Sequence, residues 1–282
     1  MLLRSPRPSV LVAGFAAGLL LAPGASIAAD LKPQTVEAWN RYVAATVARI
    51  DRELTSTEGF LVLDFQAGGR VDADRRALAR GEILVDEMET RDADGDGIDV
   101  PDGSIQHWRG AVLIPGLSLD RLMAALESGD TIRGQQDVVD WRVLERGPRR
   151  LRTFIRIRRE SVVTVTYDTE HEVVIAPAVD GRASSRSVAT RIAEIEDPGA
   201  PNERARPPGD DRGFFWRLNA YWRYEETPDG VIAEVESLTL SRSIPLVVRP
   251  LVGVFVNRIA RESVRSTLDG LRANLAREPA GR

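Results

Sequence analysis

The chain has 282 residues and a net charge of −4, from 38 Lys and Arg against 42 Asp and Glu, and it contains no cysteine. The absence of cysteine excludes disulfides, thiolate metal sites and a cysteine nucleophile, and the mild negative balance argues against a dedicated nucleic-acid-binding protein. Lys32 is the single lysine, and it lies just after an N-terminal segment that we expect to be removed, as argued below. Lysine-based covalent chemistry therefore has no candidate inside the fold.

Residues 1–29 have the features of a signal peptide. Two arginines precede an apolar run at 10–22, and the segment that ends at Ala28 fits a small-residue cleavage site. The run is shorter than the roughly 20 apolar residues that span a bilayer, and an uncleaved N-terminal anchor is the alternative. We therefore expect a periplasmic or secreted protein, cleaved near Ala28, in which residues 30–282 form one domain.

Apolar residues at three- and four-residue steps predict an amphipathic helix over 35–54, which should pack one face on the body of the domain. Ser118 is a suitable N-cap for a second helix that ends near Gly129. Between these helices the pattern predicts short elements: a strand at 60–65, a helical turn at 72–79, strands at 82–90 and 105–114, and an Asp- and Gly-rich turn at 92–103.

From residue 138 onward, long strand-like segments are separated by short turns, which implies an antiparallel meander. The expected strands are 140–145, 151–159, 161–175, 182–196, 214–224 and 231–240. A single long helix follows from about residue 250, with an apolar stripe formed by Leu251, Phe255, Ile259, Val264, Leu268, Leu271 and Leu275. The predicted fold class is therefore α+β, a curved antiparallel sheet wrapped around a long C-terminal helix.

Alternation of side chains separates the two faces of the expected sheet. The apolar face of strand 214–224 carries Trp216, Leu218, Trp222 and Tyr224. The other face of several strands is charged, and its members are Arg156, Arg158, Arg191, Arg217, Arg223, Glu234 and Glu236. This pattern predicts a ladder of opposite charges on a solvated convex face. If an arginine turns inward instead, Arg191 and Arg217 are the candidates to bind an acidic head group.

The order of elements resembles the helix-grip fold of the START-like (SRPBCC) superfamily. Four segments look like an exported bacterial branch of that group: 105–116 (IQHWRGAVLIPG), 187–196, 216–225 and Arg261-Glu262-Ser263. The likeness covers about residues 60–276. It implies a cavity between the concave sheet and the long helix that holds an apolar small molecule. Members of the superfamily transport or sense lipids, bind hydrophobic metabolites or, in the cyclase branch, catalyse ring closure.

We therefore expect an exported, non-enzymatic protein that binds or transports a lipid-like ligand. The expected lining is Trp216, Leu218, Trp222, Tyr224, Phe255 and Ile259, with Arg191, Arg217 and His107 as polar contacts. The expected partner is an apolar small molecule or lipid, without nucleic acid or cofactor; the protein should be a monomer, and transient membrane contact is compatible with this function. Two alternatives are a cyclase- or hydrolase-like enzyme that uses His107 or Tyr221 as acid or base, and a periplasmic interaction module whose core is filled.

Two further features have both a purely structural and a functional interpretation. The segment 92–99 fits the first half of a calcium loop, but Gly103 stands where the bidentate glutamate belongs, so an ordinary Asp- and Gly-rich turn is favoured. His107 and His171 are the only histidines and lack metal-ligand spacing. We expect His107 to be a hydrogen-bonded structural residue and His171 to lie on the surface of a strand.

Overall fold

The computed structural model describes residues 31–132, 135–160, 164–207, 209–243 and 249–277, with backbone alone for 249–257. The helices are α1 (Pro33–Leu54), α2 (Arg70–Ala79), α3 (Leu119–Ser128) and α4 (Arg249–Arg277), and two 3-10 turns are η1 (Val62–Phe65) and η2 (Asp130–Ile132). The strands are β1 (Leu84–Glu87), β2 (Gly103–Pro115), β3 (Val138–Gly147), β4 (Arg150–Glu160), β5 (Thr164–Ile175), β6 (Arg182–Glu196), β7 (Arg204–Ala205), β8 (Arg217–Thr227) and β9 (Gly230–Arg242).

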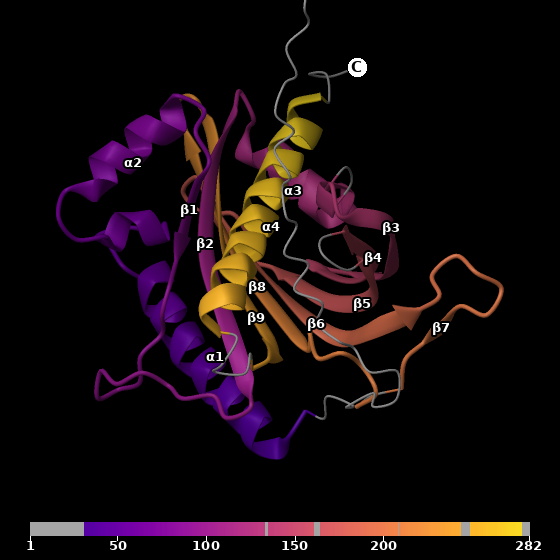
Figure 1. Ribbon diagram of the computed structural model, residues 1–282. Coiled ribbons are helices and arrows are strands. Elements are labelled where there is room, and N and C mark those ends of the chain that lie inside the picture. The colour runs from indigo at the N-terminus through magenta and orange to yellow at the C-terminus, as the bar shows by residue number, and fades with distance from the viewer. Residues whose placement is uncertain (1–30, 133–134, 161–163, 208, 244–248, 278–282) are drawn as a thin grey trace, which may run out of the picture.

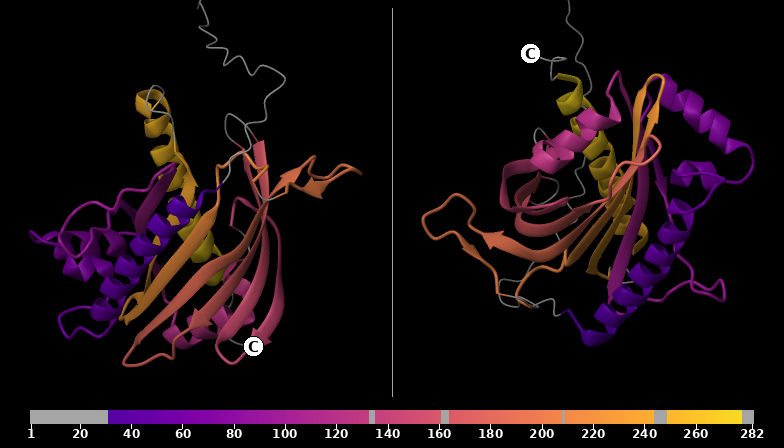
Figure 2. Two further views of the ribbon diagram at one scale, coloured as in Figure 1. Left: turned by 90° about the horizontal axis from the view of Figure 1, so that it is seen from below. Right: turned by 180° about the vertical axis from the view of Figure 1, so that it is seen from behind.

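The strands form one antiparallel sheet in the order β1-β2-β9-β8-β6-β5-β4-β3, and β7 pairs with the end of β6. The sheet is curved, α4 lies inside the curve, and α1 and α2 lie outside it (Figures 1 and 2). The α+β fold class with a long C-terminal helix against a curved sheet is therefore confirmed. Among the described residues, none of the helices combines the length and the apolar character that a membrane crossing needs.

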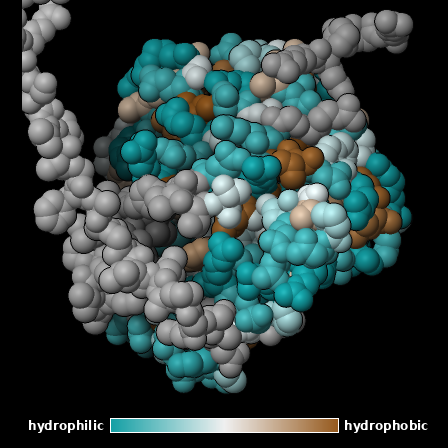
Figure 3. Space-filling view, turned by 45° about the vertical axis from the view of Figure 1, so that its right-hand side comes forward, coloured by the Kyte–Doolittle hydropathy of each residue, from teal (hydrophilic) through white to brown (hydrophobic). Residues whose placement is uncertain are grey.

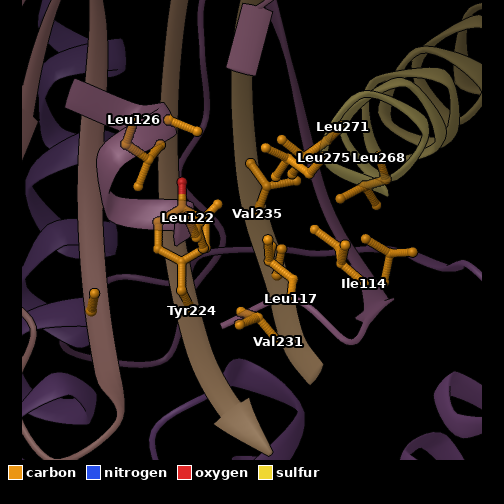
Figure 4. Close-up of a cluster of buried hydrophobic side chains, with 14 of the residues drawn as sticks. Ile114, Leu117, Leu122, Leu126, Tyr224, Val231, Val235, Leu268, Leu271 and Leu275 are labelled. Carbon is orange, nitrogen blue, oxygen red and sulfur yellow. The ribbon is translucent and has the colours of Figure 1, made fainter. Parts of the chain in front are cut away.

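The concave face of the sheet is packed against α4 and α3 at one end. Buried residues of α4 contact β1 and β2 and share one apolar cluster with residues of β9, and Leu122 and Leu126 of α3 close the cluster around Tyr224 (Figure 4). The α4 residues in this cluster are Val264, Leu268, Leu271 and Leu275, which belong to the predicted stripe; Ile259 of the same stripe is half-buried. Gly110 of β2 permits the close approach, because a Cβ there would lie 2.4 Å from Val264 Cγ1 and 2.6 Å from Leu268 Cδ1.

The convex face is covered by α1 over β8 and β9, and by η1 and α2 over β2 and β9. The strand predicted at 60–65 is wrong, because this segment forms the turn η1. The carboxylate of Asp64 accepts hydrogen bonds from the amides of Phe60 and Leu61, both at 2.9 Å, and this closes the backbone into a turn. The apolar residues of the segment are nevertheless buried, so hydrophobicity alone could not distinguish a turn from a strand here.

Candidate functional site

The concave face continues beyond the region that α4 packs. The main contacts of α4 fall on β2 and β1, whereas β8, β6, β5 and β4 extend the same face away from them. Side chains alternate between the two faces of a strand, so Ile175, Ala183 and Tyr224, which contact the α4 cluster, identify the α4 side of β5, β6 and β8. This part of the concave face is the candidate site.

Its apolar part begins at the edge of the packed core. Trp222 is partly buried and stacks on Tyr224, with ring centroids 6.0 Å apart and planes at 9°. Ala220 and Val173 are also partly buried on this side. The Tyr224 hydroxyl is 3.2 Å from Ser185 Oγ, which provides a hydrogen-bond partner for a buried polar atom. The result is an apolar wall with an aromatic pair at its base.

Further along the same face lies a group of neutral polar side chains around His171. His171 is 4% exposed, and its Nε2 lies 2.9 Å from Thr169 Oγ1 while its Nδ1 lies 3.4 Å from Ser187 Oγ. Thr153 faces His171 from β4, is fully buried, and its Oγ1 makes no hydrogen bond within the described part of the chain. Burial lowers the pKa of His171 to about 4, so the ring is neutral near pH 7. The expectation that His171 is a surface residue is wrong.

The far end of the concave face carries a buried carboxylate. Glu194 of β6 is 2% exposed and pairs with Arg212 Nε at 3.0 Å and Arg206 Nε at 3.4 Å. Tyr167 lies opposite Glu194 in the register, and its ring contacts Phe215 edge-on at 5.5 Å. Burial raises the pKa of the Tyr167 phenol, and the negative charge of Glu194 acts in the same direction. The segment that precedes β8 therefore closes this end of the face.

A second polar cluster lies on the opposite, convex face, beneath α1. Glu236 is 1% exposed, accepts a hydrogen bond from His107 Nε2 at 3.0 Å, and pairs with Arg49 of α1. The His107 Nδ1 is 3.0 Å from the hydroxyl of Tyr42, which accepts the Thr90 amide at 2.8 Å. Burial alone would raise the pKa of Glu236, but the His107 hydrogen bond and the Arg49 charge outweigh burial and lower this pKa to about 2. His107 is therefore a buried, hydrogen-bonded residue that does not face α4.

The same cluster continues through the arginines of β8 and β2. Arg223 donates to the Phe60 carbonyl at 2.8 Å and pairs with Glu53 of α1 at 2.5 Å. Glu234 accepts the amides of Val62 and Leu63, the latter at 3.1 Å, and lies 3.5 Å from Arg109 Nη1. Complete burial raises the pKa of Glu234 to about 7, although Arg109 and Arg223 act against this shift.

The predicted ladder of charges on the convex face is confirmed in one half of the sheet and wrong in the other. Arg156 binds Asp168 through Nε at 2.7 Å, and Arg191 lies 3.7 Å from Glu170 and is about half exposed. Arg223, Glu234 and Glu236, in contrast, are buried under α1 and η1. Strand alternation correctly grouped these residues on one face, but it carries no information on which helix covers that face.

The predicted lining residues are not all brought together. Trp222 lies on the α4 side beside the core, Tyr224 is buried within the core, and Leu218 is half-buried on the same side of β8. Trp216 precedes β8 and packs with Trp39 and Leu240 on the α1 side, where its Nε1 donates to Asp211 at 3.1 Å. Its expected place on the apolar α4 side is therefore wrong, because the regular alternation begins only at β8.

The remaining predicted residues are placed as follows. Arg217 lies on the α1 side of β8, is half-buried, and donates to the Trp216 carbonyl at 2.9 Å; burial lowers its pKa. Arg191 is on the outer surface, so neither arginine faces α4. Ile259 is half-buried on α4, and the side chain of Phe255 lies outside the described residues. Tyr221 is buried on the α1 side and accepts a hydrogen bond from Asn219 at 3.0 Å.

The Asp-rich segment at 92–99 folds as a closed turn. One carboxylate oxygen of Asp92 accepts the amides of Asp94 at 3.0 Å and Asp96 at 2.9 Å, so this oxygen is used within the turn. The described ranges contain no group of three or more His, Asp or Glu side chains that could hold a metal ion. The observed hydrogen bonds match the interpretation as an ordinary Asp- and Gly-rich turn.

Two surface depressions lie away from the candidate site. One, of about 580 Å³, is lined by charged residues of α4 and the chain before β1, including Glu82, Arg265 and Asp269. The other, of about 370 Å³, lies beside Arg41 and Asp99. In the space-filling view of one side, the coloured apolar residues form small patches between hydrophilic ones (Figure 3). Neither depression offers the apolar wall found on the concave face.

Three residues of the candidate site were not anticipated: Thr153, His171 and Ser187. The signal for Thr153 was present, because it shares one face of β4 with the apolar residues Leu151 and Ile155. His171 was hidden by its acidic neighbours, which point to the other face of β5. Reading every second residue of β5 from Ile175 backward would have placed His171 on the apolar side.

No family model matches the chain, and the search of curated proteins finds no match. Solved structures that are similar include a STAR-related lipid transfer protein from Xanthomonas axonopodis, with 17% identity, a TM-score of 0.43, and coverage of 67% of this chain and 98% of that one. The human StarD13 lipid transfer and protein localization domain has 9% identity and a TM-score of 0.39, covering 76% and 100% of the two chains. The Zhui aromatase/cyclase from Streptomyces sp. R1128 has 11% identity and a TM-score of 0.38, covering 62% and 95%. By its own strand order and the long helix inside its curved sheet, the chain has a helix-grip architecture.

Proposed function

We propose that this protein is an exported binding or transport protein for an apolar, lipid-like ligand. The ligand lies against the concave face of β4, β5, β6 and β8, and α4 covers one side of it. The observation that carries the proposal is the wide concave face beyond the contacts of α4, where Trp222, Ala220 and Val173 are only partly buried beside a packed core. Apolar walls with a few polar groups are typical of small-molecule sites.

The arrangement favours binding over catalysis. His107 and Tyr221, the expected acid or base, lie on the α1 side of the sheet and are buried there. His171 faces the candidate site, but its ring touches hydroxyl groups rather than a carboxylate, and its lowered pKa makes it a weak base. General acid–base catalysis works best with a pKa near the working pH. No observation on the described face therefore favours the enzymatic alternative.

The proposal predicts that a ligand accompanies the protein through purification. The protein is purified without detergent, extracted with organic solvent and analysed by mass spectrometry, and the stripped protein is then titrated with an apolar fluorescent probe. We expect a released apolar molecule and saturable probe binding that the released molecule displaces. Trp222→Ala should weaken probe binding about tenfold or more, since it removes most of one aromatic wall.

Val174→Ala is the matched control, because Val174 is 43% exposed and points away from the α4 side of β5. Its affinity for the probe should equal that of the unmodified protein. If no small molecule is released and no probe saturates the stripped protein, the binding function is rejected. The filled-core interaction module would then be the better description.

A further inference from the structure

The neutral polar group around His171 has an unsatisfied hydrogen-bonding capacity. Thr153 Oγ1 is fully buried and has no hydrogen-bond partner among the described residues, although buried hydroxyl groups are nearly always paired. Leaving such a group without a partner costs on the order of 1–3 kcal/mol. Such a hydroxyl on the proposed ligand-facing side is therefore available to pair with a group that arrives with the ligand.

The hydrogen bonds of the group determine which hydrogens are available. The Thr169 hydroxyl donates to the Ile155 carbonyl at 2.9 Å, so its oxygen can accept the hydrogen of His171 Nε2 at 2.9 Å. His171 is then the Nε2–H tautomer, and its Nδ1 lone pair faces the Ser187 hydroxyl at a long 3.4 Å. Ser187 is held weakly and Thr153 not at all. Ser187, which is half-buried, can thus donate to, or accept from, another molecule, and Thr153 can do so once the side chains that cover it move aside.

Among the described residues, the strand neighbours of this group on the same face are uncharged. In the register, Thr153 and Ala189 flank His171 on the neighbouring strands, and Thr169 and Val173 are the next residues on the same side of β5. The nearest described carboxylate on this side of β6 is Glu194, which is already paired with two arginines. A buried anion without a cation is strongly disfavoured. The group is therefore suited to an uncharged polar function and unsuited to a carboxylate or phosphate.

We propose that Thr153, Ser187 and His171 form a subsite for the neutral polar end of the ligand, a hydroxyl or carbonyl group, while the apolar body lies against Val173, Ala220 and Trp222. This inference rests on the proposed function and specifies its ligand class. Lipids with an alcohol, ester or ketone at the buried end fit the subsite. Lipids that would bury an acidic head group do not.

The test compares three probes of equal chain length, dodecanol, dodecanoate and dodecane, by displacement of a bound fluorescent probe near pH 7. Dodecanol should bind more tightly than dodecane by about fivefold, the equivalent of one net hydrogen bond. Dodecanoate should bind more weakly than dodecanol. Thr153→Val should remove the preference for dodecanol and leave the affinity for dodecane unchanged, because valine has the same shape without the hydroxyl.

Thr190→Val is the matched control, since Thr190 is exposed at the bulge of β6 and bonds the Glu170 carbonyl. It should retain the preference for the alcohol. If Thr153→Val does not fold, Ser187→Ala provides the same comparison with a smaller expected effect. Equal binding of all three probes, or tightest binding of dodecanoate, overturns the subsite but leaves the binding function intact. Failure of every probe, together with no co-purifying molecule, rejects the binding function itself.

Discussion

Gly110 shows how one residue determines the distance between α4 and the sheet. A Cβ at this position would overlap Val264 and Leu268, both of which are buried at the centre of the concave core. We expect Gly110→Ala to destabilise the protein by about 1–3 kcal/mol, because α4 must shift or its side chains must leave their rotamers. Chemical denaturation followed by circular dichroism measures this change.

Gly97→Ala is the control for Gly110→Ala. Gly97 lies in an exposed turn, where a Cβ would meet only Glu89 Oε1 at 3.6 Å. The free energy of unfolding of the Gly97→Ala variant should stay within about 0.5 kcal/mol of that of the unmodified protein. Equal stability of the two variants would show that α4 does not pack on Gly110 as described.

How far the candidate site could be predicted also depends on single residues. Trp222 was placed on the correct face by alternation, and the resemblance implied that α4 faces it. Trp216 was misplaced, because the alternation was extended across the irregular residues before β8. His171 was misjudged from its neighbours in sequence, whereas its neighbours in space are Thr153 and Ser187. The residues next to His171 in the sequence therefore did not show what it contacts, because its contacts are set by the pairing of β5 with β4 and β6.

At the scale of elements, α1 is held on the convex face by buried ion pairs as well as by apolar contacts. Arg49 and Glu53, one turn apart on α1, reach Glu236 and Arg223 on the sheet. Breaking a buried pair by removing one partner typically costs about 3–5 kcal/mol. We therefore expect Glu236→Gln to lower the free energy of unfolding by about 3 kcal/mol near pH 7.

The pH dependence of this variant tests the same contact. The pKa of Glu236 falls from its ordinary 4.5 to about 2 on folding, so its stabilising effect is complete above pH 4.5 and is lost as the pH falls toward 2. The stability difference between the unmodified protein and Glu236→Gln should shrink over that range. For Glu234 the sign is opposite, because its pKa rises to about 7.

Glu234→Gln is therefore the contrasting variant. Relative to it, the unmodified protein should lose stability as the pH rises from about 4.5 to 7. Unfolding curves at several pH values measure both differences. The same pH profile for both variants would contradict the assignment of opposite shifts in pKa.

The elements themselves were largely predictable from the sequence. Which face of the sheet is covered by α1, η1 and α2 was not. Periodicity located α1, α3, α4 and the long strands, because each buries one face and so alternates with its own period. The segment that forms η1 was mistaken for a strand, since its turn is closed by the side chain of Asp64. The burial of Glu236 was missed because charged residues are normally exposed. The charge of Glu236 is matched by Arg49 of α1, which is distant in sequence.

At the scale of the whole molecule, export remains our proposal for residues 1–29, which lie outside the described residues. Expression of the full chain in a bacterium with two membranes should release a periplasmic protein that begins just after Ala28. Intact mass and N-terminal sequencing of the periplasmic fraction measure this. Ala28→Arg should retain the uncleaved precursor, because the cleavage site requires a small residue there. A full-length cytoplasmic product from the unmodified chain would contradict export.

The two halves of the sheet differ in how they are supported. The strands β1, β2 and β9 lie between α4 on one side and the α1, η1 and α2 layer on the other, and β8 also lies beneath α1. The outer side of β4 and β5, in contrast, carries the charged ladder, and none of the described helices lies above it (Figures 1 and 2). We therefore expect thermal bending to be concentrated in β4 and β5. Under the proposed binding function, a ligand would enter by deflection of these outer strands, while α4 stays in place on β2 and preserves the core.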